Sequence, residues 1–276
     1  IAIIIIGYTY LRTLTFSILW EKIALSFVLG SGLLTLSWFL LYLLGGSFTL
    51  TSFFLAIIMV SMIGLVSSMP FAPTKYSSLP PLKKLDKWLL GIIIFFTLLA
   101  TVVAWYNPIV SWDTLTLYDF RGISIADNGS LKSFETSTYY LSYPLMTSLV
   151  HAAFYLLGGS NPQIFYALVY ASILAIVYGR MLRWTKRSHA GVATLLVAIN
   201  PLMFEHATIS YTNLPYASLL LAGFFYSSSS LVISGILIGL STWVRSSEPF
   251  WIVGALMIMI AGIRQKKYLQ TIASLG

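Results

Sequence analysis

The feature that most constrains this chain is a series of apolar stretches, several of them as long as a membrane-spanning helix. A helix needs roughly 20 apolar residues to cross about 30 Å of hydrocarbon. Residues 23–44, 48–69, 88–106 and 163–182 meet or approach that length, and residues 1–9 resemble the end of an earlier span. The sequence therefore predicts an all-α fold, a polytopic bundle of transmembrane helices.

The remaining apolar stretches are shorter, and their boundaries are harder to predict. They are 144–157, 190–204, 211–225, 231–244 and 249–263. Only 9% of the residues are charged, whereas a soluble domain has about 25%, so composition also favours a membrane protein. The chain has no cysteine, which excludes disulfides, thiolate metal sites and cysteine nucleophiles.

The distribution of charge predicts which loops face the cytoplasm. Lysine and arginine concentrate in cytoplasmic loops, and the loop 70–87 contains four lysines. If that loop is cytoplasmic, the span 88–106 places the following loop outside. The basic run 180–187 then lies on the cytoplasmic side only if residues 144–157 lie along the membrane face and do not cross it. The short length of that stretch favours this arrangement. Three of the 16 basic residues remain outside: Arg121, Lys132 and Arg245.

The same arrangement makes the outer surface acidic. Its carboxylates are Asp113, Asp119, Asp127, Glu135, Glu205 and Glu248. The net charge of +8 is therefore interpreted as a topology signal, and nucleic acid is not an expected partner. The loop 107–160, which we expect to carry juxtamembrane helices, contains four of these carboxylates and is the predicted site of any chemistry.

Asp113 is the first candidate catalytic residue. It follows Trp112 directly after a predicted span, at the interfacial depth where tryptophan is enriched. A carboxylate there is partly desolvated and suited to accept a proton. The alternative is a helix N-cap, because aspartate is a preferred cap and residues 114–120 are compatible with a helix. Asp119 and Arg121, two residues apart, are interpreted as an exposed ion pair. Residues 127–130 are predicted to form a turn.

A second group of candidates reaches the same outer surface from later helices. Arg245 is an arginine outside the positive-inside pattern, and its forked donors suit a phosphate; snorkelling to lipid headgroups is the alternative. His206 is either a phosphate donor, a metal ligand or an interface residue. The group is His206, Tyr211, Asn213, Arg245 and Glu248. Gly235 and Gly239 fit a small-xxx-small pattern that predicts close helix packing.

Four stretches in order carry a resemblance to a known family. Residues 112–122 (WDTLTLYDFRG) resemble a first external loop with a Trp-Asp pair, and residues 143–145 (YPL) a Pro-Leu signature that opens the next helix. Residues 205–215 resemble a motif that usually reads Tyr-Ala-Asp-Leu-Pro, and residues 239–249 one that usually ends Lys-x-Glu-Gly. The chain resembles the membrane glycosyltransferases of the C fold (GT-C), which use polyprenyl-phosphate sugars and include protein mannosyltransferases and lipid A aminoarabinose transferases.

The resemblance implies roles for individual residues. Asp113 takes the place of the catalytic aspartate, and Arg245 stands where lysine is usual, which keeps the charge. Asn213 stands where aspartate is usual, which weakens a metal site there, although a divalent cation remains possible. The donor's phosphate and sugar are then expected to bind Arg245, Glu248, His206, Arg121, Asp119, Asn213 and Tyr211. Residues 1–276 are expected to form a single transmembrane domain that is truncated at its N-terminus and at its C-terminus.

Two classes of function follow. The first is an inverting glycosyltransferase in the plasma or inner membrane, with its active site facing outside. Its partners would be a polyprenyl-phosphate sugar donor, a lipid, glycan or protein acceptor, and membrane lipids. The second is a polytopic secondary transporter, or a protein that handles lipid-linked glycans without transferase activity. No phosphate-binding glycine loop indicates a nucleotide substrate.

Overall fold

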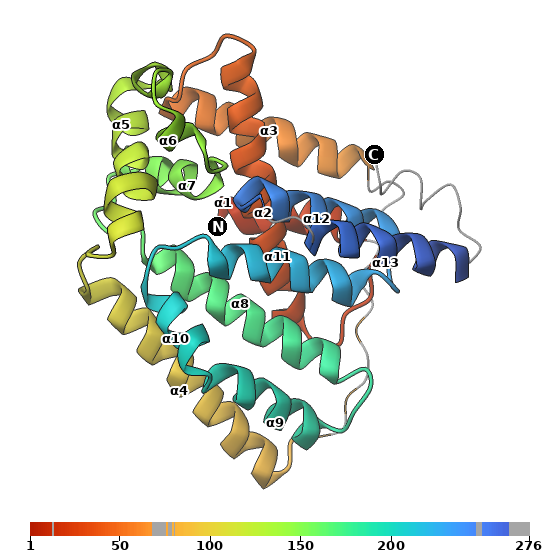
Figure 1. Ribbon diagram of the computed structural model, residues 1–276. Coiled ribbons are helices and arrows are strands. Elements are labelled where there is room, and N and C mark those ends of the chain that lie inside the picture. Colours follow the sequence, from red (N-terminus) through yellow and green to blue (C-terminus); the bar gives the residue numbers. More distant parts are fainter. Residues whose placement is uncertain (13, 68–75, 77–78, 80, 247–249, 265–276) are drawn as a thin grey trace.

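The computed structural model of this chain describes residues 1–276 except 13, 68–75, 77–78, 80, 247–249 and 265–276. Figure 1 shows a bundle of helices, and an isolated bridge between Phe16 and Tyr76 is the one β-type pairing in the described part. The elements are α1 (Ala2–Tyr10), α2 (Leu19–Leu43), α3 (Leu50–Ser67), α4 (Lys84–Tyr106), η1 (Thr114–Asp119), α5 (Phe120–Asn128), η2 (Lys132–Phe134), α6 (Thr138–Leu141), α7 (Met146–Leu156), α8 (Ile164–Met181), α9 (Arg187–Ala198), α10 (Pro201–Thr208), α11 (Asn213–Tyr226), α12 (Leu231–Val244) and α13 (Phe250–Arg264). The predicted all-α class is confirmed.

Among the described residues, four helices are long and apolar enough to cross a membrane: α2, α3, α4 and α8. In the most apolar 18-residue segment of each helix, the buried share is 61% in α2 and 72% in α8. In α3 and in α4 it is only 22%. Helices α2 and α8 therefore form the centre of the bundle. Helices α3 and α4 are apolar on all sides yet mostly uncovered by protein, which is the pattern of helices that face lipid.

The predicted single stretch 190–204 is wrong, because the chain bends there. Helices α9 and α10 meet at 63° and would make a fifth span if the pair crosses together. Asn200 caps α10 by accepting hydrogen bonds from the backbone N–H groups of Leu202 and Met203, and Pro201 occupies the first turn, where its missing N–H costs nothing. The freed carbonyl of Ala198 accepts a hydrogen bond from the Tyr170 hydroxyl of α8 at 2.7 Å.

The two ends of the bundle differ in character. The basic end is where α2 and α4 begin and α8 ends, and it gathers Lys22, Lys83, Arg180, Arg183, Lys186 and Arg187. Here α8 passes so close to α2 that a Cβ on Gly179 would lie 2.6 Å from the side chain of Glu21. Glu21 is fully buried and accepts a hydrogen bond from Tyr226 of α11 at 2.7 Å.

The opposite end, the site end, is where α4 and α12 end and α8 and α11 begin. Asn161, just before α8, donates to the carbonyls of Ala104 and Asn107 at the end of α4, both at 3.0 Å. Helix α7 starts beside the loop 140–144 and finishes just before Asn161, so both of its ends lie at the site end. Residues 144–157 therefore do not run from one end of the bundle to the other.

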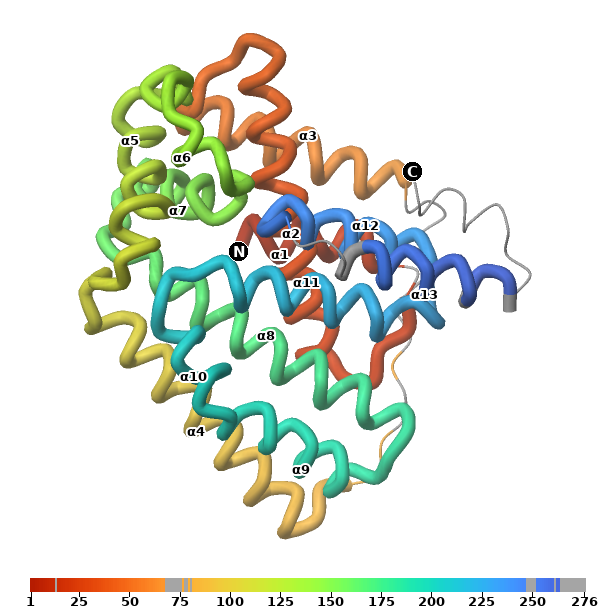
Figure 2. Tube along the Cα trace, in the orientation of Figure 1, coloured from red at the N-terminus to blue at the C-terminus, as the bar shows by residue number. Residues whose placement is uncertain are grey.

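Figure 2 shows α8 between α11 and the α9–α10 pair. This arrangement of helices positions the residues of the site. Residues 107–145 fold as a compact cap at the site end, containing η1, α5, η2 and α6. Helix α5 ends at Asn128, and Gly129 adopts the left-handed conformation with φ of 65°, which glycine tolerates best. The predicted turn at residues 127–130 begins too early, because Asp127 and Asn128 are the last two residues of α5 and the chain leaves the helix only at Gly129. The carbonyl of Gly129 also accepts a hydrogen bond from the N–H of Phe48, which ties the cap to the loop after α2.

Candidate functional site

Asp113 lies at the entrance to a π-helical turn. Its backbone is already helical, with φ of −60° and ψ of −32°, and η1 follows it directly. Its side chain is exposed and makes no capping hydrogen bond. Asp113 occupies the N-cap position of η1, but the N-cap interpretation is wrong for its side chain, which makes no capping hydrogen bond. Single π-helical turns occur frequently at functional sites, and this one leaves the carboxylate facing solvent.

Arg121 is the most fully buried charged residue of the cap. It is 0% exposed and donates from Nε to the Ser148 hydroxyl at 2.9 Å, and from Nη1 to the carbonyls of Tyr140 and Tyr143 at 2.7 and 2.9 Å. Nη2 donates to the carbonyl of Pro144 at 3.2 Å. Burial lowers the pKa of Arg121 to about 10, so it stays charged at neutral pH.

Arg121 therefore holds the loop 140–144 against α7. Four of its five N–H donors are used by protein groups, which leaves little capacity for a donor phosphate. The expected exposed ion pair between Asp119 and Arg121 is wrong, because both side chains are buried and each has other partners.

Asp119 is 6% exposed and joins a chain of buried polar side chains. Its Oδ1 lies 2.8 Å from Nδ1 of His151 and accepts a hydrogen bond from the Tyr155 hydroxyl at 2.6 Å. The other ring nitrogen of His151 lies 3.0 Å from the hydroxyl of the fully buried Tyr166 in α8. We call Asp119, Arg121, Ser148, His151, Tyr155 and Tyr166 the closed cluster.

The closed cluster depends on the close approach of α5 and α7. A Cβ on Gly122 would lie 2.5 Å from Cβ of His151, so only glycine permits this separation. Little in the sequence indicated that His151, Tyr155 and Tyr166 form a network. A lone histidine inside the apolar stretch 144–157 was the one available signal, since a buried histidine needs hydrogen-bond partners.

A second group, which we call the open cluster, consists of Asp113, His206, Asn213 and Arg245. Arg245 follows the end of α12 and donates from Nη1 to Oδ1 of Asn213, at the start of α11. The amide nitrogen of Asn213 lies 3.2 Å from Nε2 of His206 in α10. All three side chains are half-buried. The structure thus brings together three predicted residues from three helices.

The hydrogen-bond chain determines the tautomer of His206. Because Arg245 has no acceptor, it must face the oxygen of the Asn213 amide, and the amide nitrogen must face His206. Nε2 of His206 then accepts, so the ring is neutral and Nδ1 carries its proton. Nδ1 is buried and has no hydrogen-bond partner in the described part of the chain. Tyr211 packs beside this ring, with centroids 6.0 Å apart.

Asp113 belongs to the same region through η1. The hydroxyl of Thr114 donates to the carbonyl of Ser210, just before Asn213, at 3.2 Å. Tyr118, also in η1, is 4% exposed and interacts with both Asp113 and Thr212. Burial raises the pKa of the Tyr118 phenol, so it remains protonated and can donate. Asp113 and Arg245 therefore lie at the same end of the bundle.

No group of three potential metal ligands from His, Asp and Glu occurs among the described residues. At Asn213 the guanidinium of Arg245 occupies the oxygen that a divalent ion would bind, so this position does not fit a metal. Glu248, a predicted ligand of the donor, lies outside the described residues.

Comparisons with protein families, with characterised proteins and with solved structures found no match to this chain. The function of this chain is therefore inferred from the geometry of the site end. Glu205 is exposed on α10 next to His206.

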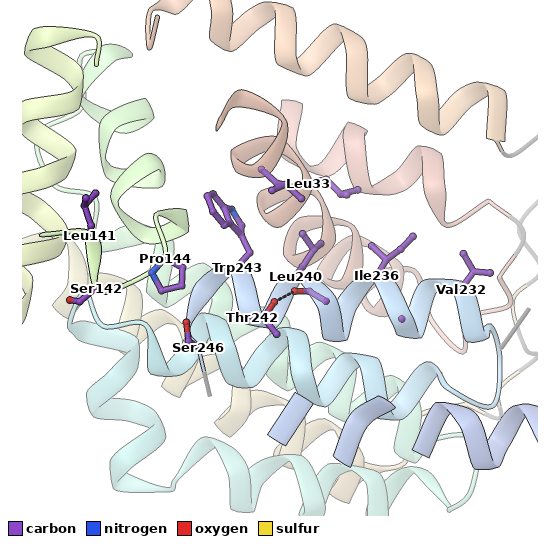
Figure 3. Close-up of a pocket in the computed structure, with 13 residues that line it drawn as sticks. Leu33, Leu141, Ser142, Pro144, Val232, Ile236, Leu240, Thr242, Trp243 and Ser246 are labelled. Carbon is purple, nitrogen blue, oxygen red and sulfur yellow. Dashed lines mark hydrogen bonds between the residues drawn. The ribbon is translucent and has the colours of Figure 1, made fainter. Parts of the chain in front are cut away.

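An apolar groove runs from the site end along α12, with a volume of about 740 Å³. Figure 3 shows Val232, Ile236 and Leu240 in a row on one face of α12, with Leu33 of α2 across from them. Its polar lining residues Ser142, Thr242 and Ser246 come from the site end, and Ser246 directly follows Arg245.

Glycines help to hollow this groove. Gly235 and Gly239 both line it. A Cβ on Gly239 would meet no atom within 4 Å. The predicted close packing through this small-xxx-small pattern is therefore wrong at Gly239, because this glycine opens space instead of contacting a helix.

Proposed function

We propose that this protein is a multi-pass membrane glycosyltransferase that takes a sugar from a polyprenyl-phosphate donor and transfers it to an acceptor hydroxyl, with inversion, on the non-cytoplasmic face. The observation that carries the proposal is the arrangement of three features at the site end. An exposed carboxylate, a half-buried arginine and the mouth of a long apolar groove all lie there.

Asp113 would act as the general base. Its carboxylate is exposed and makes no hydrogen bond or ion pair to any described residue, so it is available to an incoming hydroxyl. As the acceptor oxygen attacks the anomeric carbon, its proton passes to Asp113. The bond between the anomeric carbon and the phosphate oxygen breaks, and its electron pair leaves with the polyprenyl phosphate.

Arg245 would bind the donor phosphate. Asn213 fixes one of its Nη atoms and leaves other donors of the guanidinium for a ligand. A charged donor aimed at the leaving phosphate stabilises the charge that develops as the bond breaks. The neutral His206 holds Asn213 in turn and acts as a positioning residue.

The groove would hold the lipid chain of the donor. From Val232 to Trp243 it follows α12 for about 16 Å, at 1.5 Å per residue. Its walls are mainly aliphatic, while its polar residues lie at the mouth beside Arg245. This distribution matches an amphiphile with a phosphate at one end, and it provides a reason why no nucleotide-binding loop is needed.

The test is transfer of labelled sugar from a polyprenyl-phosphate donor by the purified full-length protein. Asp113→Asn should lower the rate by about 100- to 10,000-fold, the usual contribution of a general base. Asp127→Asn is the matched control, because Asp127 is an exposed carboxylate of the same loop at the end of α5. Equal activity of Asp113→Asn and the parent protein would eliminate the mechanism.

One observation favours a secondary transporter as the second candidate. The 63° bend between α9 and α10 resembles the broken helices that line transporter substrate sites. However, the carbonyl of Ala198 at the break is bonded to Tyr170 and is not free for an ion. Substrate uptake into proteoliposomes without formation of a glycosidic product would favour the transporter over the enzyme.

A further inference from the structure

A second pocket lies at the basic end, far from the proposed site in the fold. It has a volume of about 300 Å³ and is enclosed by the start of α4, the end of α8 and the start of α9. Leu182 supplies an apolar wall, while Thr185 and Ser188 supply hydroxyls. Neither the proposed transfer reaction nor the open cluster uses this pocket.

Three cationic side chains line the pocket: Lys83, Lys186 and Arg187. The one carboxylate among its described lining residues is Asp86, which accepts a hydrogen bond from the backbone N–H of Lys83 at 2.9 Å. Asp86 thereby caps the start of α4 and is 4% exposed. The lining residues carry a net charge of +2, from three cations and one anion.

The backbone adds donors in the same place. Helix α9 begins at Arg187, and its N-cap residue Lys186 makes no side-chain capping bond. The first N–H groups of α9 therefore lack the partner that a capping side chain would supply, and they form the positive end of the helix dipole. Nε of Arg187 is buried and has no hydrogen-bond partner among the described residues, although the Arg187 side chain interacts with Tyr178.

We propose that this pocket binds the phosphate group of an anionic ligand. Lys186 and Arg187 supply charge-assisted hydrogen bonds, Lys83 supplies a further cation, and Ser188 with the start of α9 supplies neutral donors. A phosphate monoester or diester presents several acceptor oxygens, which suits several convergent donors. The ligand is either the headgroup of an anionic phospholipid, since basic pockets at this membrane surface recognise such headgroups, or a free phosphate in water.

The experiment uses the purified full-length protein in a neutral detergent. Its thermal unfolding is followed while phosphatidylglycerol, phosphatidylcholine or inorganic phosphate is added. A ligand that binds the folded state raises the midpoint of unfolding in proportion to its occupancy. We expect phosphatidylglycerol or inorganic phosphate to raise the midpoint, and the neutral phosphatidylcholine to leave it unchanged.

Two double variants remove the same charge from the same end of the bundle. Lys186→Gln with Arg187→Gln should raise the concentration for half-maximal stabilisation by at least about tenfold, because two charge-assisted contacts are lost. Lys84→Gln with Lys87→Gln is the control, since both lysines are exposed at the start of α4 and do not line the pocket. A charge-preserving variant, Lys186→Arg with Arg187→Lys, should retain binding.

The outcomes identify the type of ligand and test the proposal. Stabilisation by phosphatidylglycerol alone identifies a lipid headgroup, and stabilisation by inorganic phosphate identifies a free phosphate compound. The proposal is overturned if neither anion stabilises the protein, or if both glutamine variants lose the effect equally, which would indicate unspecific attraction to a basic surface. Loss of sugar transfer in Asp113→Asn has no bearing on this result, so the two proposals fail separately.

Discussion

The closed and the open cluster lie at the same end of the bundle but differ in how their polar atoms are satisfied. In the closed cluster, Arg121 is fully buried and donates four hydrogen bonds to protein groups, and Asp119 is held by His151 and Tyr155. In the open cluster, the Asp113 side chain is exposed and makes no hydrogen bond or ion pair within the described structure, and Arg245 has one bond to Asn213.

The difference separates structural polar residues from those available to a ligand. Removing one partner of a buried, satisfied group leaves the others unpaired, which costs about 1 to 3 kcal/mol for each group. Removing an exposed side chain changes stability by less than about 0.5 kcal/mol. The two clusters should therefore respond oppositely in assays of unfolding and of sugar transfer.

The largest expected effect on stability is at Arg121. Arg121→Met should lower the free energy of unfolding by about 4 kcal/mol, because the carbonyls of the loop 140–144 and the Ser148 hydroxyl lose their donor. The measurement is denaturant unfolding in detergent. Arg245→Met is the matched control and should cost less than about 1 kcal/mol. Equal costs for the two arginine variants would contradict the division into two clusters.

Asp119 should give the next largest effect. Asp119→Ala removes the acceptor of His151 and Tyr155 and should destabilise the protein by about 1.5 to 3 kcal/mol, the range for hydrogen bonds to a charged group. Asp127→Ala, at an exposed position of the same loop, should change stability little. Thermal unfolding followed by circular dichroism compares the two. A tolerated Asp119→Ala would mean that the buried chain to Tyr166 contributes no stability.

Gly122 tests the close packing that brings the closed cluster together. Gly122→Ala should destabilise the protein by about 1 to 2 kcal/mol, because the new methyl group would overlap Cβ of His151. Gly91→Ala in α4 is the control, since a Cβ there meets nothing within 4 Å and alanine favours a helix. The same unfolding assay should show no destabilisation for Gly91→Ala, and an opposite ranking would argue against the contact.

The smallest expected change in stability is at Asp113. Asp113→Asn should alter the free energy of unfolding by less than about 0.5 kcal/mol, because the side chain is exposed and unbonded within the described chain. The same variant is expected to lose most of its transfer activity. A large loss of stability would show that Asp113 is structural and would move it into the closed cluster.

Some predictions made from the sequence agree with the fold, because they depend only on the pattern of neighbouring residues. The four long apolar stretches correspond to α2, α3, α4 and α8, with boundaries shifted by up to four residues. The bend at Asn200 was missed although an asparagine before a proline is a recognisable helix start. The apolar periodicity continues across that break, and hydrophobicity alone does not report direction.

The partners of charged residues required the tertiary structure. Sequence proximity favoured a pair between Asp119 and Arg121, but the two side chains leave the backbone toward different neighbours, His151 in one case and the loop 140–144 in the other. Asn213 and Arg245 were grouped correctly because the number of spans between them fixes which end of the bundle each reaches. The hydrogen bond between them, and the tautomer it imposes on His206, could not be read from spacing.

The sequence by itself determined that this chain forms helices long and apolar enough to span a membrane, because length and hydrophobicity are properties of contiguous residues. It also determined which polar residues belong to which end. Only the tertiary structure decided which of those residues are buried and satisfied and which are available. Burial depends on the close approach of helices that are distant in the chain, such as α5 and α7 at Gly122. Where helices meet, the geometry of the side chains decides which of several chemically suitable groups becomes the hydrogen-bond partner of a polar residue.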